Sequence, residues 1–375
     1  MRIAVNTRFL LPGRLDGIGW FTYETLKRIT TAHPEHTFYF LFDRPFNRRF
    51  IFSDNIHPCV VYPPARHPFL WYVWFQHSIP RVLNKIKPDV FFSPDGFIPL
   101  KHSIPVVSVI HDLNFEHYPK DLPPAVRYYY RHYFKTFATE AKEIITVSRF
   151  SKDDIVKQYQ VDPEKIHVVY NGVNEKFQPL SEEDKKRIRS ENTGGSPYIL
   201  HTGSLLPRKN ISRLLQAFDL FRKDHPDFKL ILAGGKISGI RDIYHQWHRM
   251  KFRHEVIFTG YIEAEHLRRI TAAAETLVLV SYFEGFGLPL LEAMACHVPV
   301  VCGNVTALPE IAGEAVLLTD PFSVSGIAKN LTKIIDNASL RRNLISRGQE
   351  RVAQFNWDST AESVWNVLTK QLSGH

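Results

Sequence analysis

The sequence predicts an α/β protein made of two doubly wound, Rossmann-like domains that face each other across a cleft. Its 375 residues exceed the usual size of a single hydrophobic core. Short apolar runs, typical of strands buried on both faces of a parallel sheet, alternate with helical patterns. This alternation occurs twice along the chain, before and after a polar segment, which indicates two domains of the same class.

The first series of strands lies in the first 170 residues. Most are short runs rich in Val, Ile and Phe. The expected strands are Ile3–Asn6, Thr37–Phe42, Asp89–Phe92, Val106–Ile110, Ile144–Val147 and Ile166–Val169. Sheets of this class bind ligands beyond the carboxyl ends of their strands, so the loops that follow these strands are candidate sites.

A charged segment that ends in Asn-Thr-Gly-Gly-Ser-Pro separates the two series and has the composition of a linker. We therefore expect an N-terminal domain over residues 1–172, a linker over 173–195 and a second domain over 196–354.

The second series repeats the pattern. Its expected strands are Tyr198–Thr202, Lys229–Ala233, Val256–Thr259, Thr276–Val280, Val298–Val301 and Ala315–Leu318. Among the helical stretches between them, Ser212–Lys223 is a clear example, because its apolar residues recur at helical spacing.

Composition narrows the class of protein. Hydrophobic content of 44% and charged content of 23% are ordinary for a globular protein. Three cysteines without metal-ligand spacing argue for a reducing compartment. No signal-type segment or membrane-length apolar run is present, so we expect a cytoplasmic protein, acting either in solution or at the inner face of the membrane.

The formal net charge of +9 is concentrated in the first half, where residues 1–170 carry 22 Lys and Arg against 16 Asp and Glu. This excess suits an anionic membrane, a nucleic acid, a phosphorylated substrate or simply a basic surface. No recognisable nucleic-acid motif is present, so we expect no nucleic-acid partner.

The most informative motif spans Phe283–Glu292, where Glu284 and Glu292 flank a glycine turn between a predicted strand and a predicted helix. The turn and the helix start consist of Gly285, Phe286, Gly287 and Leu288. Such a strand–turn–helix gathers backbone amides and the positive end of the helix dipole at an anion site. Two acids beside that site suit a ligand with both phosphate and hydroxyls, such as a nucleotide sugar. The alternative is an ordinary turn with two surface acids.

A second loop carries adjacent cations. Gly203 follows the strand Tyr198–Thr202, and Arg208 and Lys209 stand at the start of the next helix. Cations are unfavourable at that end of a helix unless an anion is shared between them. Because arginine offers a bidentate fork and lysine a compact charge, the pair predicts a phosphate contact, with solvated surface as the alternative.

Two features of the first half complete the candidate site. Gly17 and Gly19, after the first strand, would let backbone approach a ligand, or else make an ordinary turn. His111 and Asp112 follow a strand directly. The pair leaves open whether His111 is a base, an orienter, a hydrogen-bond donor or a satisfied structural residue.

Taken together, these motifs resemble the retaining glycosyltransferases of family 4, which have the GT-B fold. The resemblance covers nearly the whole chain and also rests on Thr146-Val147-Ser148, Asn171-Gly172-Val173 and Gly260-Tyr261. It implies that Glu284, His111, Arg208 and Lys209 are catalytic. It implies that the donor is bound by Gly17, Gly19, Gly203, Arg208, Lys209, Tyr261, Glu284, Gly285, Phe286, Gly287, Leu288 and Glu292.

The resemblance also implies roles. Glu284 would hold hydroxyls of the donor sugar and Glu292 the ribose, while Arg208 and Lys209 neutralise the diphosphate and His111 lies near the reacting face of the sugar. Overall likeness to polysaccharide mannosyltransferases favours GDP-mannose mildly, with a UDP-sugar as the other possibility. The acceptor would be a glycan or a lipid-linked glycan of a surface polysaccharide.

We expect no cofactor and no metal, because the sequence contains no Asp-x-Asp triplet and side-chain cations can take the place of an ion. Two other readings stay open: a membrane- or nucleic-acid-binding module, and a sugar-nucleotide epimerase or a phosphorylase of the same fold. The chain departs from the family pattern at Asp16, where many relatives have glycine, and at His297, where the preceding helix often ends in glycine.

Aromatic runs over residues 66–76 and 127–135 have two interpretations. One is core packing with Arg127, Arg131 and Lys135 on the outer face. The other is docking to an anionic membrane. Finally, residues 355–375 predict a helix capped by Asp358 or Ser359. The resemblance suggests that this helix crosses back to the first domain.

Overall fold

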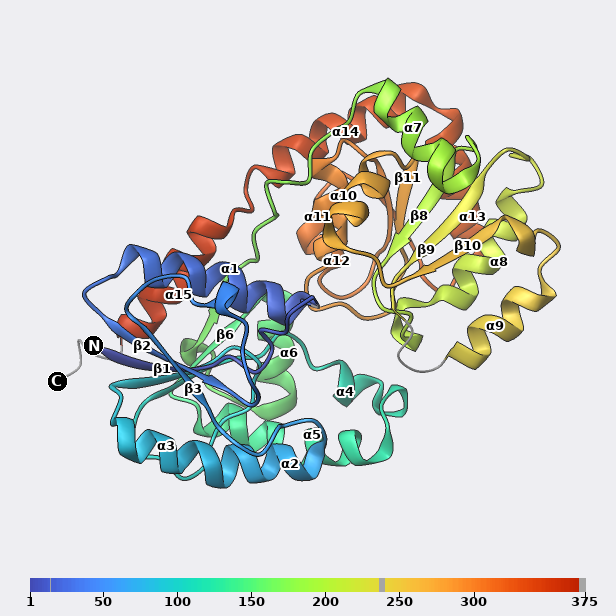
Figure 1. Ribbon diagram of the computed structural model, residues 1–375. Helices are drawn as coiled ribbons and strands as arrows, with labels where there is room; N and C mark the ends of the chain where they lie inside the picture. The colour runs from blue at the N-terminus through green and yellow to red at the C-terminus, as the bar shows by residue number, and fades with distance from the viewer. Residues whose placement is uncertain (14, 236–239, 371–375) are drawn as a thin grey trace. The chain divides into compact units, whose positions relative to one another are not determined.

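The computed structural model describes residues 1–13, 15–235 and 240–370 (Figure 1). The chain divides into two compact units: Met1–Gly172 with the segment that starts at Asn356, and Val173–Phe355. Each unit contains one parallel sheet with helices packed against it (Figure 1). The prediction of two Rossmann-like α/β domains is therefore confirmed.

The first unit holds a seven-stranded sheet in the order β3-β2-β1-β4-β5-β6-β7. Its strands are β1 (Arg2–Asn6), β2 (Thr37–Phe42), β3 (Ile56–Val60), β4 (Val90–Ser93), β5 (Val106–Val109), β6 (Glu143–Thr146) and β7 (Ile166–Val168). Strand β3 is absent from the strands predicted from the sequence. It lies at the sheet edge and contains Pro58 and the exposed His57, so it lacks the apolar pattern of a buried strand.

The helices of the first unit include α1, whose first turn contains both glycines predicted to form a loop or turn. They are α1 (Gly17–Ala32), α2 (Pro68–Val73), α3 (Ile79–Ile86), α4 (Asn114–His117), α5 (Pro124–Glu140), α6 (Arg149–Tyr159) and α15 (Trp357–Lys370). Helix α1 starts at Gly17 because Asp16 caps it: an Asp16 carboxylate oxygen accepts the N–H of Gly19 at 3.0 Å. The two glycines thus lie in the first helical turn and not in a loop before it.

The aromatic run on α5 packs mainly into the core of this unit. Tyr129, Phe134 and Phe137 are at most 3% exposed, and they join a cluster around Phe97. The interpretation of this run as a core stripe is therefore confirmed for these residues. By contrast, Tyr128 on the same helix is 68% exposed.

Helix α15 packs against α1 within the first unit (Figure 1). The prediction that Asp358 or Ser359 caps it is wrong, since the Asn356 side chain accepts the N–H of Ser359 at 2.7 Å. Asp358 instead pairs with Arg28 of α1 at 2.5 Å. Residues 371–375 of the predicted C-terminal segment lie outside the described residues.

The second unit holds a six-stranded sheet in the order β10-β9-β8-β11-β12-β13. Its strands are β8 (Tyr198–Thr202), β9 (Lys229–Ala233), β10 (Val256–Gly260), β11 (Thr276–Leu279), β12 (Val300–Gly303) and β13 (Leu317–Thr319). Strand β12 begins two residues later than predicted. Val298 is still part of the preceding helix end, where its N–H donates to the Ala293 carbonyl at 2.9 Å.

The helices of the second unit are α7 (Glu182–Thr193), α8 (Ile211–Phe221), α9 (Ile240–Arg249), α10 (Ala264–Ala272), α11 (Leu288–Ala295), α12 (Leu308–Ala312), α13 (Val324–Asp336) and α14 (Ala338–Val352). Helix α7 lies inside the segment predicted as a linker. Its N-cap Ser181 accepts the N–H of Asp184 at 3.1 Å, and its charged side chains suit a solvated helix. No helix of the described residues is both long and apolar enough to cross a bilayer.

Gly172 provides a test of how α15 is attached to the first unit. A Cβ atom at this position would overlap the backbone of Asn356 and Trp357, which cannot move aside as a flexible side chain can. We expect Gly172→Ala to lower the free energy of unfolding of this unit by about 1–3 kcal/mol, the usual cost of overpacking. Urea denaturation followed by tryptophan fluorescence measures this change.

Gly17→Ala is the matched control, because a Cβ there meets no atom of the described residues within 4 Å. It should alter stability by no more than about 0.5 kcal/mol. Equal stability of the two variants would contradict the close packing of Gly172.

Candidate active site

Glu284 is the centre of a buried ion cluster in the second unit. Its carboxylate is bonded to both predicted cations: Arg208 Nη1 at 2.9 Å and Lys209 Nζ at 2.5 Å. Glu284 is only 6% exposed and Lys209 only 8%. The cations predicted to bind phosphate and the acid predicted to bind a sugar are thus in direct contact with each other.

Sheet topology explains why these residues meet. From β8 the chain proceeds through β9 and β10 on one side, and from β11 it proceeds through β12 and β13 on the other. The neighbours β8 and β11 therefore form the switch point at which loops diverge and ligands bind. Arg208 and Lys209 follow β8, and Glu284 follows β11.

The charges hold Glu284 in its ionised form. Burial alone would raise the pKa of its carboxyl, but the nearby Lys209 and Arg208 outweigh that effect and lower the pKa to about 2. The hydroxyl of Ser281 also donates to the carboxylate, at 2.6 Å. Glu284 is consequently an anion throughout the physiological range and not a proton donor.

The cationic loop is fixed by its backbone as well as by its charges. Arg208 and Lys209 lie in a short 3₁₀ turn, and Asn210 follows in the left-handed conformation before α8 begins. The Asn210 side chain donates to the carbonyls of Val280 at 3.0 Å and Pro321 at 2.6 Å. Asn210 thereby ties this loop to the end of β11.

Gly203 makes room beside Lys209. Its φ of +122° favours glycine, and a Cβ there would lie 3.7 Å from Lys209 Nζ. A Cβ at Gly234, after the adjacent strand β9, would overlap the Gly203 carbonyl. The carboxyl ends of β8 and β9 therefore approach closely only because Gly234 lacks a side chain, whereas Gly203 is favoured by its backbone conformation.

Glu292 lies on α11 and differs sharply from Glu284. It is half-buried, and burial raises the pKa of its carboxyl to about 7. The helix begins after Gly287, whose φ is +105°. Pro289 has no amide hydrogen and the Leu290 N–H donates to Gly287, so this helix start offers fewer amides to an anion than its sequence pattern suggests.

Three supporting residues could not be identified from local patterns. Ser281 and Thr306 both fix Glu284, the latter by accepting its backbone N–H at 3.1 Å. His201 lies fully buried on β8, where burial and Lys209 lower its pKa to about 4. Its Nδ1 lies 3.0 Å from the Val278 carbonyl, and its Nε2 has no hydrogen-bond partner among the described residues. Only its position on a strand next to the cationic loop hinted at a role.

The other predicted donor-binding residues of this unit differ in exposure and in their position relative to β11. Phe286 is buried and packs edge-on against Phe355, so only its backbone is available to a ligand. Tyr261 is 52% exposed and follows β10, which is separated from β11 by two strands. Gly285 and Leu288 lie in the turn and helix start next to Gly287.

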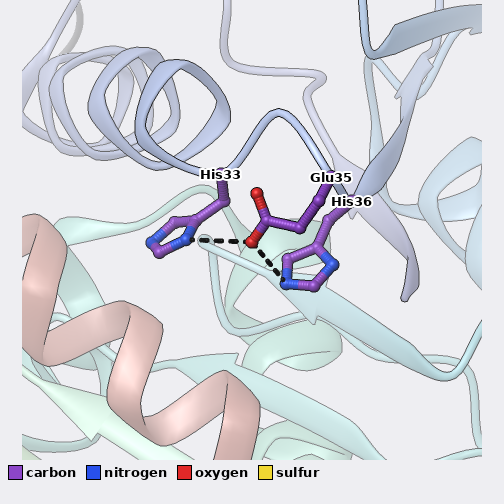
Figure 2. Close-up of side chains that lie close together, drawn as sticks. All are labelled: His33, Glu35 and His36. Carbon is purple, nitrogen blue, oxygen red and sulfur yellow. Dashed lines mark ion pairs between the residues drawn. The ribbon is translucent and has the colours of Figure 1, made fainter.

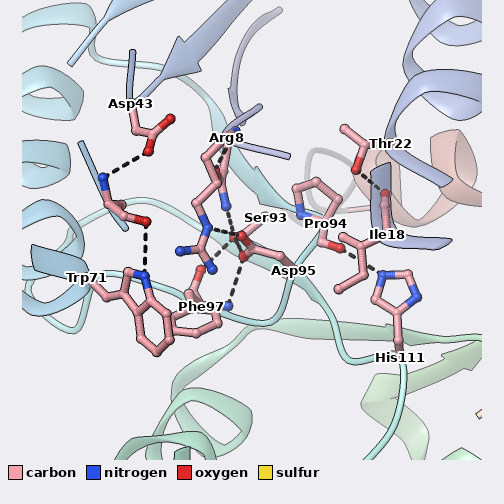
Figure 3. A network of polar contacts seen from close by, with 12 residues as sticks. Arg8, Ile18, Thr22, Asp43, Trp71, Ser93, Pro94, Asp95, Phe97 and His111 are labelled. Carbon is pink, nitrogen blue, oxygen red and sulfur yellow. Dashed lines mark hydrogen bonds and ion pairs between the residues drawn. The ribbon is translucent and has the colours of Figure 1, made fainter. Parts of the chain in front are cut away.

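In the first unit, His111 follows β5 at the carboxyl edge of the sheet. Its Nε2 lies 2.9 Å from the Pro94 carbonyl (Figure 3). A carbonyl can only accept, so Nε2 carries the proton and Nδ1 is left as an acceptor when the ring is neutral. Burial lowers the pKa of His111 and favours that neutral form. The imidazole can accordingly accept a hydrogen bond, or a proton, from a hydroxyl.

The loop that carries Pro94 is held by a second buried ion pair. Arg8 follows β1 and its Nε lies 2.5 Å from the carboxylate of Asp95, which follows β4 (Figure 3). The Arg8 guanidinium also lies 4.3 Å from the centre of the Phe97 ring. Since β1 and β4 form the switch point of the first sheet, the two units place an ion pair at the same topological position.

Asp16, where the sequence departs from the family pattern, has a structural role. Because its side chain accepts the Gly19 N–H, that amide is already engaged in this structure, and a phosphate contact there would have to displace the cap. A Cβ at Gly17 would meet no atom within 4 Å in the part of the chain that the structure describes. His297, the other departure, adopts a φ of +57° and thus takes the left-handed conformation at the cost expected for a non-glycine residue.

Among the described residues, neither the acids around Glu284 nor those around His111 form a group of three metal-ligating side chains. Among the residues that the structure describes, one group of three His, Cys, Asp or Glu side chains lies close enough to share an ion, and it consists of His33, Glu35 and His36. That group is at the opposite edge of the first sheet from His111.

Two protein-family models match this chain, and they cover its two halves separately. Residues 15–177 match the model of Glycosyltransferase Family 4, and residues 182–351 match that of Glycosyl transferases group 1. O-antigen chain mannosyltransferase B of Escherichia coli is 32% identical over 292 residues, which cover 76% of this chain and 75% of that protein.

Solved structures share the architecture of the whole chain. Sucrose-phosphate synthase from Thermosynechococcus elongatus has a TM-score of 0.81 at 20% identity, with 100% of both chains covered. HepE from Anabaena, solved with UDP and glucose, has a TM-score of 0.77 at 18% identity and covers 99% of this chain and 100% of its own. At these identities the likeness shows the fold alone, which is GT-B.

The raised pKa of Glu292 predicts a pH effect on stability. A carboxyl whose pKa rises from 4.5 to about 7 on folding stabilises the protein fully below pH 4.5 and loses that contribution as the pH rises through about 7. Glutamine does not ionise, so the Glu292→Gln variant does not lose unfolding free energy in this way. Relative to Glu292→Gln, the wild type should therefore lose at most about 3 kcal/mol of unfolding free energy across this range.

Denaturant titrations at a series of pH values measure this difference. Glu350→Gln, at an exposed glutamate of the same unit, is the control and should keep the wild-type profile. A Glu292→Gln profile parallel to that of the wild type would show that Glu292 ionises normally.

Proposed function

This chain belongs to the glycosyl transferases of group 1 and family 4, and we propose that it transfers mannose from a nucleoside diphosphate donor to a glycan of a surface polysaccharide. The observation that carries the proposal is the contact of Glu284 with Arg208 and Lys209 at a sheet switch point. The choice of mannose rests on likeness to the Escherichia coli O-antigen mannosyltransferase. GDP-mannose is our first choice of donor, and a UDP-sugar is the second.

The ion cluster supplies the charges that such a reaction needs. When the glycosidic bond to the donor breaks, negative charge grows on the departing diphosphate, and two preorganised cations stabilise it. In the structure Arg208 and Lys209 are neutralised in part by Glu284. We infer that the diphosphate takes over part of this pairing, which leaves Glu284 able to accept hydrogen bonds from the sugar.

Glu284 and Glu292 have separate tasks in this proposal. Glu284, with its pKa held near 2, is suited to accept hydrogen bonds from sugar hydroxyls and unsuited to donate a proton. Glu292, whose pKa is near 7, accepts ribose hydroxyls most strongly once ionised. Neither acid is assigned as a nucleophile. We infer transfer with retention, by attack on the face from which the phosphate departs, unlike the carboxylate pair of a retaining hydrolase.

Two competing functions predict different products. A binding module would take up nucleotides without turnover, and an epimerase would change the sugar without transfer to a glycan. Incubation with GDP-mannose, UDP-glucose and related donors, with and without a mannose-terminated acceptor, distinguishes them by release of the nucleoside diphosphate. Acceptor-dependent release supports the transferase, while a new sugar nucleotide without release supports the epimerase.

Paired substitutions in the ion cluster should change diphosphate affinity in opposite directions. Glu284→Gln removes the anion that competes for Lys209 and Arg208, so we expect GDP or UDP to bind about tenfold more tightly while most of the transfer activity is lost. Lys209→Ala removes a phosphate contact, so affinity and turnover should both fall about tenfold or more. Calorimetry with the free nucleotide and a release assay measure the two effects.

Arg347→Ala is the control, since Arg347 is an exposed cation of the same unit paired with Glu314. Unchanged nucleotide affinity in both cluster variants would place the phosphate elsewhere. Near-normal transfer by Glu284→Gln would remove Glu284 from the mechanism.

We further propose that the first unit docks on an anionic membrane that carries the acceptor. Exposed aromatic residues on two adjoining helices support this: Phe69 of α2 and Tyr128 of α5 are each 68% exposed. The rings of Tyr72 and Tyr133, on the same two helices, lie 6.0 Å apart. Lys135 is exposed on α5 and can contact a lipid phosphate, contributing about 1 kcal/mol. Arg131 is also exposed, and its guanidinium is paired with Glu116 at 3.3 Å.

Co-sedimentation with vesicles of phosphatidylglycerol and phosphatidylcholine tests this surface. We expect binding at low salt that falls at high salt, and that weakens at least about tenfold in the double variant Phe69→Ser, Tyr128→Ser. Leu220→Ser, at an exposed apolar residue of the second unit, should bind as the wild type does. Equal sedimentation with and without vesicles would rule the surface out.

A further inference from the structure

A compact group of His33, Glu35 and His36 occupies the connection from α1 to β2 (Figure 2). His33 is the C-cap of α1, and β2 begins at Thr37. The group therefore lies at the amino-terminal edge of a parallel sheet, while Arg8 and His111 lie at the carboxyl edge. It takes no part in the proposed transfer reaction.

The spacing of the three side chains is that of ligands around one ion. Glu35 Oε1 lies 3.6 Å from His33 Nδ1 and 3.2 Å from His36 Nε2. All three ligand atoms lie within 4.8 Å of one another. Two ligands of a tetrahedral ion with bonds of about 2.0–2.2 Å stand roughly 3.3–3.6 Å apart. Small rotations of the side chains would thus bring all three onto a common centre.

The rings are already held in place. The His33 ring stacks on Trp365 of α15 with centroids 3.8 Å apart, and the His36 ring lies 5.1 Å from the same indole. A metal binds an imidazole nitrogen in the plane of the ring, so stacking on the ring face is retained. In the structure the Met1 ammonium donates to His36 Nδ1 at 3.0 Å, so binding of an ion at His36 Nε2 requires this contact to open and the ring proton to move to Nδ1.

Electrostatics in this loop suit a cation. The Glu35 carboxylate places a negative charge within 3.6 Å of a nitrogen of each imidazole. The carbonyl end of α1 adds partial negative charge. A cation here is attracted by the Glu35 carboxylate and by the helix end, and it competes with protons for the imidazole nitrogens.

We propose that His33, Glu35 and His36 form a binding site for a divalent late transition-metal ion, with Zn²⁺ as its first choice and water completing the coordination. Two imidazoles and one carboxylate are a common ligand set for zinc, and imidazole also suits Cu²⁺ and Ni²⁺. Because His33 packs on Trp365, an ion here links the α1–β2 loop to α15 and stabilises the first unit.

Calorimetric titration of the untagged full chain with ZnCl₂ tests the site. We expect one site in the wild type that is weakened at least about tenfold by His36→Gln and by His33→Gln, equivalent to about 1.4 kcal/mol or more. Glu35→Gln should weaken it as well. His67→Gln is the control, at an exposed histidine of the same unit. Wild-type affinity in the double variant His33→Gln, His36→Gln, or no binding by the wild type, would overturn the proposal.

Two further measurements keep the test independent of folding. Melting curves in EDTA establish that each variant folds, and added ZnCl₂ should raise the melting temperature of the wild type but not of His36→Gln. CuCl₂ should quench the fluorescence of Trp365. The share of the quenching that belongs to Trp365 is the share that is lost in Trp365→Phe. We expect the same share to be lost in His33→Gln. Quenching that His33→Gln leaves intact would place the ion elsewhere.

Discussion

Ion pairs buried at the switch points of the two sheets are the constraint on which the candidate site depends. A charge removed from water must be paired and hydrogen-bonded, because an unpaired one costs several kcal/mol. Glu284 can therefore remain buried only while Arg208 and Lys209 stay within bonding distance. That requirement fixes the loops after β8 and β11 together. The contact of Arg8 with Asp95 does the same for the loops after β1 and β4.

The same arrangement explains how a site can be rigid before a ligand arrives. Asn210 and Thr306 bond to backbone groups near Glu284, so hydrogen bonds as well as charges connect the cationic loop to the turn after β11. A ligand that replaces Glu284 as the partner of the cations meets groups that are already oriented. Preorganisation of this kind is what electrostatic stabilisation of a transition state requires.

Local patterns in the sequence were enough to identify most strands, the two-domain organisation and the motif around Glu284. They failed where a decision depends on distant residues. The edge strand β3 lacks an apolar pattern, since it is paired on one side only. Helix α15 is capped by Asn356, although Asp358 is an equally suitable cap by type, because Asp358 pairs with Arg28 more than 300 residues earlier in the chain.

The sequence by itself determined the fold class and the chemical types at the site, because hydrophobic periodicity and glycine turns act over a few residues. Tertiary structure alone decided which of these side chains are paired and which ionisation state each one takes. It paired Glu284 with Arg208 and Lys209, and it left Glu292 half-buried without their charges, so two glutamates of one motif have pKa values near 2 and near 7. Burial and charge act through space, and no spacing along the chain encodes them.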